Sequence, residues 1–156
     1  MSGTTALVAA GVAVTDQLTK ALALARLGEE PVHLFWTLRL NLSFNRGIAF
    51  SQGQGLGPLI TVAGLLLVVA LVVMSRTARD SPTAVALGLL IGGACGNLGD
   101  RLFRDHGGAV VDFIDLQWWP IFNVADMAIT MGAALLLVVG MRQPTDAGVD
   151  AGGGPR

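Results

Sequence analysis

The stretch PTAVALGLLIGGACGNLGDR, residues 82–101, contains the signals that decide the fold. It begins with a proline, which the first turn of a helix tolerates, and continues as an apolar run of roughly 20 residues. A helix of that length crosses the hydrocarbon core of a bilayer. Its second half adds small residues that allow close helix packing, and then the polar residues Asn97, Asp100 and Arg101. The stretch therefore predicts a transmembrane helix with a polar end.

Three further stretches of the same character flank it, at about residues 5–27, 57–74 and 122–141. Apolar residues make up 53% of the 156-residue chain and charged residues only 13%, which is far from the balance of a soluble domain. We therefore predict an all-α membrane protein with four transmembrane helices, in a single membrane-embedded domain over residues 1–141. Because the polar segment DQLTK, residues 16–20, interrupts the first stretch, we expect a retained helix and not a cleaved signal peptide.

Two long connections, at about residues 28–56 and 102–121, lie on the same side of the membrane if successive helices alternate in direction. The first contains LRLNLSFNRGIAF, residues 38–50, whose partly alternating pattern predicts a small extramembrane β-containing region between helices one and two. The connection after the second span has room only for a tight turn, so helices two and three are expected to be antiparallel neighbours. Residues 142–156 are rich in Gly, Pro and Asp, and we expect a disordered tail there.

Charge and aromatic residues limit the kinds of partner. The formal net charge is −1 and the chain has no run of Lys or Arg, so a nucleic-acid partner is not expected. The arginines outside the spans are spread over both sides of the membrane and leave the orientation open. The tryptophans, Trp36, Trp118 and Trp119, fall on one side, which fits an aromatic belt at the level of the lipid headgroups.

Two classes of hydrolase receive no support from the sequence. His33 and His106 have no partner at ligand spacing, so a zinc site is not indicated, and no metal or other cofactor is expected. Cys95 is the single cysteine, which excludes an intramolecular disulfide, and we interpret it as a small core residue. Neither Cys95, Ser43 nor Ser51 has a recognisable neighbouring base, so a covalent nucleophile is not indicated either.

Charged side chains near a span are costly in hydrocarbon and are therefore functional candidates unless they are paired. Asp16 and Lys20 are four residues apart in the order that favours an ion pair on one helix face, and we interpret this pair as mainly structural. Asp100 follows Asn97 by three residues on one face of the third span. For Asp100, a structural pairing with Arg101 or with the backbone competes with a catalytic role.

Three more acids follow in and after the second long connection. Asp112 and Asp115 lie in the apolar segment VVDFID, and a strand would present both to one side only with a bulge or turn between them. We therefore expect only one of the two at the site. Asp126 lies three residues after Asn123 at the start of the fourth span, where the positive end of the helix dipole stabilises a carboxylate. A solvated acid at a helix end is the simpler interpretation of Asp126 taken alone.

The clusters around Asp100, Asp112 and Asp126 nevertheless converge on one membrane face by topology, and FNRG around Asn45 joins them from the first connection. Two carboxylates that share a site cannot both ionise cheaply, so one stays protonated and the pair can act on a water as general base and general acid. This chemistry predicts an aspartic peptidase and leaves the choice of the pair open among these acids and Asp115. The alternatives are a small proton-coupled transporter subunit, with acids spread through the membrane depth, and a non-catalytic scaffold.

Five motifs occur in order between the four spans, namely DQLTK (16–20), FNRGIAF (44–50), GGACGNLGDR (92–101), VVDFI (110–114) and FNVAD (122–126). Together they resemble the signal peptidase II family, the lipoprotein signal peptidases, over nearly the whole folded chain. The resemblance implies an aspartic endopeptidase of the bacterial inner or cytoplasmic membrane, with both termini in the cytoplasm and the active site toward the extracytoplasmic face. Such an enzyme removes signal peptides from prolipoproteins, cutting before a cysteine that carries a diacylglyceryl group. We expect a monomer in contact with membrane lipid.

The resemblance also assigns roles residue by residue. It places the catalytic aspartates at Asp112 of VVDFI and Asp126 of FNVAD. Substrate-binding or supporting positions of the family match Asn45, Gly47, Asn97, Asp100, Arg101 and Asn123. Asp16 and Lys20 belong to a motif that we interpret as structural or supporting, and Asp115 matches no motif position.

Overall fold

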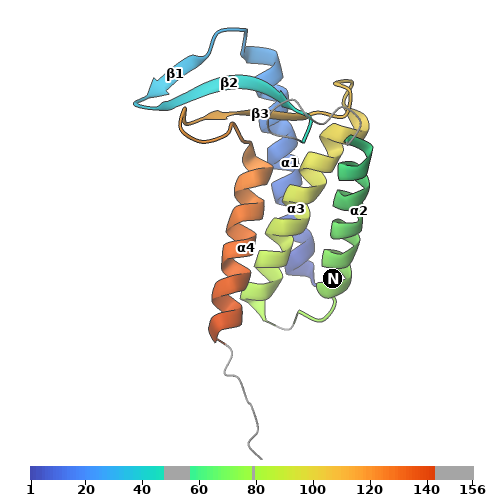
Figure 1. Cartoon of the computed structure of the whole chain (residues 1–156). Coiled ribbons are helices and arrows are strands. Elements are labelled where there is room, and N and C mark those ends of the chain that lie inside the picture. The colour runs from blue at the N-terminus through green and yellow to red at the C-terminus, as the bar shows by residue number, and fades with distance from the viewer. Residues whose placement is uncertain (48–56, 79, 143–156) are drawn as a thin grey trace, which may run out of the picture.

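The computed structural model describes residues 1–47, 57–78 and 80–142, which form a bundle of long helices with a small sheet at one end (Figure 1). The helices are α1 (Gly3–Arg26), α2 (Gly57–Met74), α3 (Ser81–Phe103) and α4 (Val124–Arg142). All four are long and apolar enough to cross a membrane, so the predicted set of transmembrane helices is confirmed. The predicted disordered tail lies, apart from its first residue, outside the described residues.

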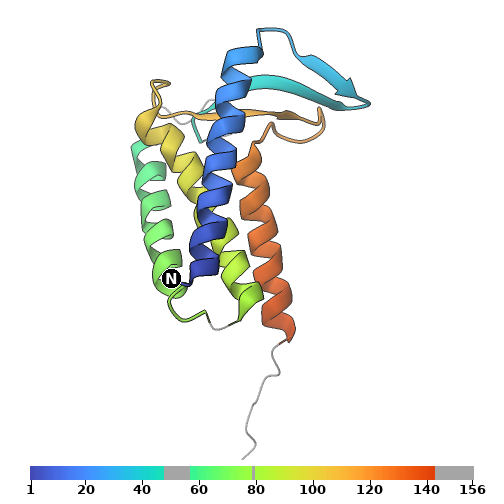
Figure 2. The ribbon, with the colours of Figure 1, turned by 180° about the vertical axis from the view of Figure 1, so that it is seen from behind.

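The central helix of the bundle is α3, which packs against α1, α2 and α4 (Figures 1 and 2). Glycines on two of its faces let the neighbouring backbones approach closely. A Cβ added at Gly92 would lie 2.6 Å from the carbonyl oxygen of Ala9 in α1, and one added at Gly93 would lie 2.5 Å from that of Ala125 in α4. Side chains larger than hydrogen at these positions would push the helices apart.

Cys95 occupies the remaining face of α3 and is exposed, so its interpretation as a core residue is wrong. The reason is the helical period. Gly92 and Gly96 face α1 and Gly93 faces α4, which turns the intervening Cys95 away from both contacts.

The sheet contains the strands β1 (Val32–Phe35), β2 (Leu38–Asn45) and β3 (Val110–Asp115), in the order β1-β2-β3 with antiparallel pairing. The predicted β region between the first two helices is confirmed, and it is extended by β3 from the connection between α3 and α4. Strand β3 is buried because it lies beneath β2 and above the ends of the helices (Figure 1). This position brings the VVDFID segment to the top of the bundle.

The hairpin of β1 and β2 extends sideways beyond the helices (Figures 1 and 2). At its turn, Trp36 has a φ of 49° and an exposed fraction of 87%. Trp118 and Trp119 follow β3 and are also exposed, and the side chain of Gln117 donates a hydrogen bond to the Thr37 carbonyl oxygen at 2.8 Å. The tryptophans therefore gather at the sheet end of the molecule.

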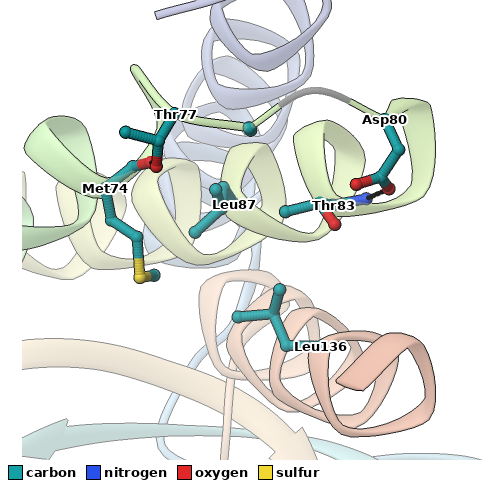
Figure 3. Close-up of a pocket in the computed structure, with 7 residues that line it drawn as sticks. Met74, Thr77, Asp80, Thr83, Leu87 and Leu136 are labelled. Carbon is teal, nitrogen blue, oxygen red and sulfur yellow. Dashed lines mark hydrogen bonds between the residues drawn. The ribbon is translucent and has the colours of Figure 1, made fainter. Parts of the chain in front are cut away.

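A shallow pocket lies at the opposite end, between the turn that joins α2 to α3 and the helix α4 (Figure 3). Its single acid is Asp80, whose carboxylate caps α3 by accepting a hydrogen bond from the Thr83 backbone at 2.8 Å. The other lining residues are Met74, Thr77, Ala78, Thr83, Leu87 and Leu136. Asp80 is the one charged side chain among the described residues that line this pocket, and its carboxylate is engaged in a helix cap.

Candidate active site

Asn123 connects the two acids that the sequence motifs single out. Its side-chain nitrogen donates to Oδ1 of Asp112 in β3 at 2.6 Å, and its backbone N–H donates to Oδ2 of Asp126 at 3.2 Å. In return, the Asp126 backbone N–H donates to Oδ1 of Asn123 at 3.0 Å, which is the reciprocal pattern of a helix capping box. Asn123 itself is fully buried. The start of α4 therefore holds both carboxylates in one hydrogen-bonded cluster.

The backbone explains why these acids meet although they lie on different elements. Phe122, just before α4, exchanges backbone hydrogen bonds of 2.9 and 3.0 Å with Ile114 of β3. This short bridge docks the entry of α4 against the strand. The bridge folds the chain between Asp112 and α4 back on itself, so that the first turn of α4 lies beside β3.

Asp112 is almost completely buried, with an exposed fraction of 2%. Burial raises the pKa of this carboxyl to about 6, and the nearby charge of Asp126 acts in the same direction, while hydrogen bonds from Asn45 and Asn123 and the charge of Lys20 oppose it. Within residues 1–47, 57–78 and 80–142, no cation forms an ion pair with Asp112. A carboxyl in such surroundings can hold a proton close to neutral pH.

Asn97 of α3 lies beneath the pair and contacts Asp126. Its side-chain nitrogen donates to Oδ1 of Asp126 at 2.9 Å. Its oxygen accepts from the side-chain nitrogen of Asn123 at 3.1 Å and from Nζ of Lys20 at 2.9 Å. Every polar atom of this amide group thus has a partner in the cluster.

Lys20 lies below Asn97 in a buried charge cluster. It forms ion pairs of 2.8 Å with both Asp16 and Asp100, and all three side chains have no exposed surface. The predicted ion pair between Asp16 and Lys20 is confirmed. The other oxygen of Asp16 accepts from the Ala125 backbone N–H at 2.9 Å, so the cluster also anchors α4 to α1.

Asp100 pairs with a different arginine from the one considered in the sequence. Arg104, one helical turn later, forms the ion pair at 2.7 Å, whereas Arg101 points elsewhere. The second expectation, a contact with backbone, is present, because Oδ2 of Asp100 accepts from the Val111 N–H at 3.0 Å. This bond ties β3 to α3 directly beneath the strand.

Arg101 and Gly47 meet at the rim of the cluster. Arg101 donates to the Gly108 carbonyl oxygen at 2.9 Å. Gly47 has a φ of 90°, and an added Cβ would lie 2.6 Å from Cδ1 of Ile60 and 3.1 Å from Nη2 of Arg101. Glycine is therefore required both by the backbone conformation and by the close approach of the guanidinium. The side chain of Asn45 accepts from the Gly47 N–H at 2.8 Å, and the last three residues of the FNRGIAF motif lie outside the described residues.

Asp115 lies apart from this cluster, in contacts of its own. Its carboxylate forms an ion pair with Arg39 at 2.7 Å and accepts from the Asn41 side chain at 3.2 Å and the Gln117 backbone at 2.7 Å. Burial alone would raise its pKa, but these hydrogen bonds and the charge of Arg39 lower the pKa of Asp115 below its usual value. The structure thus separates the two acids of VVDFID.

Two residues of the charge cluster were missed in the sequence analysis. Gln17 donates to the Gly96 carbonyl oxygen at 2.9 Å and to Oδ1 of Asp100 at 3.0 Å, and Arg104 donates to Gln17 at 3.0 Å. Gln17 lies within the DQLTK motif, and Arg104 follows Asp100 at the spacing of an ion pair on a helix face. The spacing was therefore a usable signal for Arg104.

Comparisons with known proteins agree with one another. The model of the family described as signal peptidase (SPase) II matches residues 8–142. The lipoprotein signal peptidase of Rhodococcus jostii (strain RHA1) is 45% identical over 139 residues, covering 85% of this chain and 69% of that protein. That of Syntrophomonas wolfei subsp. wolfei is 44% identical over 131 residues, covering 82% of this chain and 86% of that protein. A bacterial membrane enzyme structure, determined by the in meso method at 2.3 Å resolution, matches with a TM-score of 0.82 at 28% identity, covering 94% of this chain and 93% of that one.

Proposed function

The chain belongs to the signal peptidase II family, and from this premise we propose that Asp112 and Asp126 are the catalytic pair of the enzyme. The activity is that of a lipoprotein signal peptidase, an aspartic endopeptidase in a multi-pass membrane protein. The observation that carries the assignment of the pair is Asn123, which donates a hydrogen bond to each carboxylate. In the described part of the chain, no other asparagine donates hydrogen bonds to two acids of which one has a raised pKa.

The proposed chemistry needs one proton between the two carboxyl groups. The ionised member takes a proton from a water, which attacks the scissile carbonyl, and the protonated member gives a proton to the leaving amine. The pKa of about 6 at Asp112 supports this division of roles, since a carboxyl with that pKa can hold and release a proton close to neutral pH. The apparent pKa values of the reaction belong to the pair as a unit.

The remaining motif residues support the pair in the proposal. Asn97 and Asn123 orient the carboxylates through the hydrogen bonds described above. Asn45, Gly47 and Arg101 form the rim, where they suit contacts to the backbone of a bound peptide. The charged residues beneath them, Asp16, Lys20 and Asp100, hold α1, α3 and β3 together.

We propose prolipoproteins carrying a diacylglyceryl-modified cysteine as the substrates, with cleavage immediately before that cysteine. The acids gather at the end of the bundle that carries the exposed tryptophans, which supports a site near a membrane surface. We assign this end to the extracytoplasmic face of the bacterial inner or cytoplasmic membrane, with the chain working as a monomer surrounded by lipid in one domain over residues 1–141. The gathering of the acids at one end contrasts with the spread through the membrane depth that a transporter subunit would need.

The test of the pair is turnover of a purified, diacylglyceryl-modified prolipoprotein. Asp112→Asn and Asp126→Asn keep size and shape but remove the acid, so each variant is expected to lose about 10³-fold or more in kcat. A chelator is expected to leave the rate unchanged. Substantial turnover by either variant would remove that residue from the pair.

The substrate class needs a second comparison. The same precursor without the diacylglyceryl group is expected to be cut far more slowly, because the lipid chains place the scissile bond at the level of the acids. Equal cleavage of the two forms would contradict the proposed substrate while leaving the catalytic pair intact.

A further inference from the structure

Lys20 is a buried cation that touches neither acid of the proposed pair. Its ammonium group has three N–H donors, and they meet three oxygens, those of Asp16 and Asp100 at 2.8 Å and of Asn97 at 2.9 Å. Two of these contacts close the charge cluster. The third reaches upward to the amide group that contacts Asp126. This third contact satisfies the remaining buried N–H of Lys20, and it also joins the charge cluster to the amide group of Asn97.

The contact with Lys20 determines which way the Asn97 amide faces. Its oxygen receives two donors, Nζ of Lys20 and the side-chain nitrogen of Asn123, so its nitrogen faces Oδ1 of Asp126. In the reversed orientation the amide nitrogen would face two other donors, and its oxygen would face a carboxylate. Both changes are unfavourable in a buried site.

This orientation makes Asp126 an acceptor at both of its oxygens. Oδ1 accepts from Asn97 and Oδ2 accepts from the Asn123 backbone N–H, within the first turn of α4 where the helix dipole also favours negative charge. Hydrogen bonds donated to both oxygens of a carboxyl group favour its ionised form. Asp112 also accepts hydrogen bonds, from the side chains of Asn123 and Asn45, but its burial in β3 outweighs them and favours the protonated form.

We propose that Lys20 is a positioning residue that acts through Asn97, so that Asp126 is the ionised base of the pair and Asp112 carries the proton. The inference rests on the proposed function of Asp112 and Asp126 and adds a division of labour between them. Lys20 acts by holding the oxygen of the Asn97 amide group toward itself. The amide nitrogen is thereby directed at Asp126, to which it donates.

Other charges around Asp126 have to be considered. Lys20 and Asp16 come from α1, Asp100 and Arg101 from α3, and Asp112 from β3. Helix α2 contains no charged residue. Lys20 and Arg104 together balance Asp16 and Asp100, so the long-range field of this cluster largely cancels. The direct path through Asn97 is then the main influence of Lys20 on Asp126.

Arg104 provides a matched control for this path. Lys20→Met and Arg104→Met each remove one cation that contacts Asp100, but only Lys20 contacts Asn97. We expect Lys20→Met to lower kcat about 10- to 100-fold with KM changed less than about 3-fold. The acidic limb of its pH–rate profile, which belongs to the pair as a unit, is expected to move to higher pH, because the pair loses an N–H donor that Asn97 aims at it. Arg104→Met is expected to keep the position of that limb.

Loss of Lys20 also leaves two buried carboxylates without their ammonium partner, so the single variant is at risk of not folding. The double variant Asp16→Asn with Lys20→Met removes one charge of each sign, and an asparagine oxygen can still accept from the Ala125 N–H. It is expected to show the same displaced acidic limb. Lys20→Gln, which offers a neutral N–H donor toward Asn97, is expected to recover part of kcat and the original limb. Thermal unfolding of each purified variant in detergent verifies its fold.

Two results would overturn the inference. One is a folded Lys20→Met or double variant with the kcat and acidic limb of the parent enzyme, and the other is the same displaced limb in Arg104→Met. Asp112→Asn and Asp126→Asn are assayed in parallel. If these two are inactive while the Lys20 variants behave like the parent, the role of Lys20 fails alone. If either of them turns over substrate, the catalytic pair itself fails.

Discussion

Asp112 and Asp115 lie in the same strand, β3, and are almost equally buried, with exposed fractions of 2% and 3%, but their carboxylates have opposite surroundings. Opposite Asp115 in the sheet stands Arg39, which forms an ion pair with it, whereas the residue opposite Asp112 is the uncharged Ser43. Burial raises the pKa of Asp112 to about 6, while the partners of Asp115 lower its pKa. Low exposure alone therefore does not make a catalytic acid, because an ion pair and hydrogen bonds offset the effect of burial at Asp115 but not at Asp112.

Replacing each acid by asparagine should separate them most strongly. Asp112→Asn is expected to reduce kcat by about 10³-fold or more, because a general acid–base group is lost. Asp115→Asn is expected to stay within about 3-fold of the parent, because the contacts of its carboxylate within the described part of the chain are with the sheet and the following turn. Both rates are measured on the lipid-modified precursor. Equal losses would show that the division between the two acids is mistaken.

Ser43 offers a way to make Asp112 resemble Asp115. Directly opposed side chains lie on the same face of an antiparallel pair, so Ser43→Lys brings an ammonium group to Asp112 much as Arg39 brings its charge to Asp115. The cation should lower the pKa of Asp112 and deprive the pair of its shared proton. We expect kcat at neutral pH to fall about 10- to 100-fold.

Ser43→Met is the matched control, since it adds similar bulk without charge. It is expected to lose much less activity than Ser43→Lys. If both substitutions reduce the rate equally, bulk and not charge is responsible, and the contrast between the two acids loses its electrostatic explanation.

The sequence predicted which elements and which acids make up the molecule better than it predicted which side chains contact one another. The four spans follow from apolar length, and the ion pair of Asp16 with Lys20 follows from the helical spacing within one element. The motif resemblance separated Asp112 from Asp115, which chemistry alone left equivalent. Each of these signals is either local in the chain or carried by a known family pattern.

What could not be predicted depends on contacts between distant segments. The pairing of Arg39 with Asp115 requires the register of β2 against β3, which includes an irregularity between Leu40 and Ser43. A one-residue slip would exchange the side chains on the two faces, so no pattern within either strand identifies the partner. The contact from Lys20 to Asn97 joins α1 to α3 in the same way, through packing that close-fitting glycines permit.

Stability should respond to the two acids in opposite directions. The folded-state pKa of Asp112 lies above the unfolded value, so the folded state binds the proton more tightly and stability falls as pH rises from about 4 to about 6. Asp112→Asn removes this loss, and we expect the inactive variant to be more stable than the parent at pH 8, by about 1–3 kcal/mol. Asp115→Asn is expected to be less stable, because it gives up a favourable ion pair. Thermal unfolding in detergent at pH 8 checks both signs, and a destabilised Asp112→Asn would contradict the raised pKa.

Arg39→Met should have the smallest effect on activity and shows whether Asp115 merely holds the sheet together. The contacts of Asp115 lower its pKa in the folded state. The stability that these contacts provide is therefore fully present above the pKa of an aspartate in the unfolded chain, and it is lost as the pH falls through the pKa of Asp115 in the folded state. Without Arg39, the Asn41 and Gln117 bonds remain, so we expect a loss of about 1–2 kcal/mol near neutral pH and a shallower loss on acidification. Turnover is expected to change less than about 3-fold. A loss of turnover comparable to that of Asp112→Asn would mean that the ion pair on β2 belongs to the catalytic machinery after all, because the stability change alone is too small to inactivate a folded enzyme.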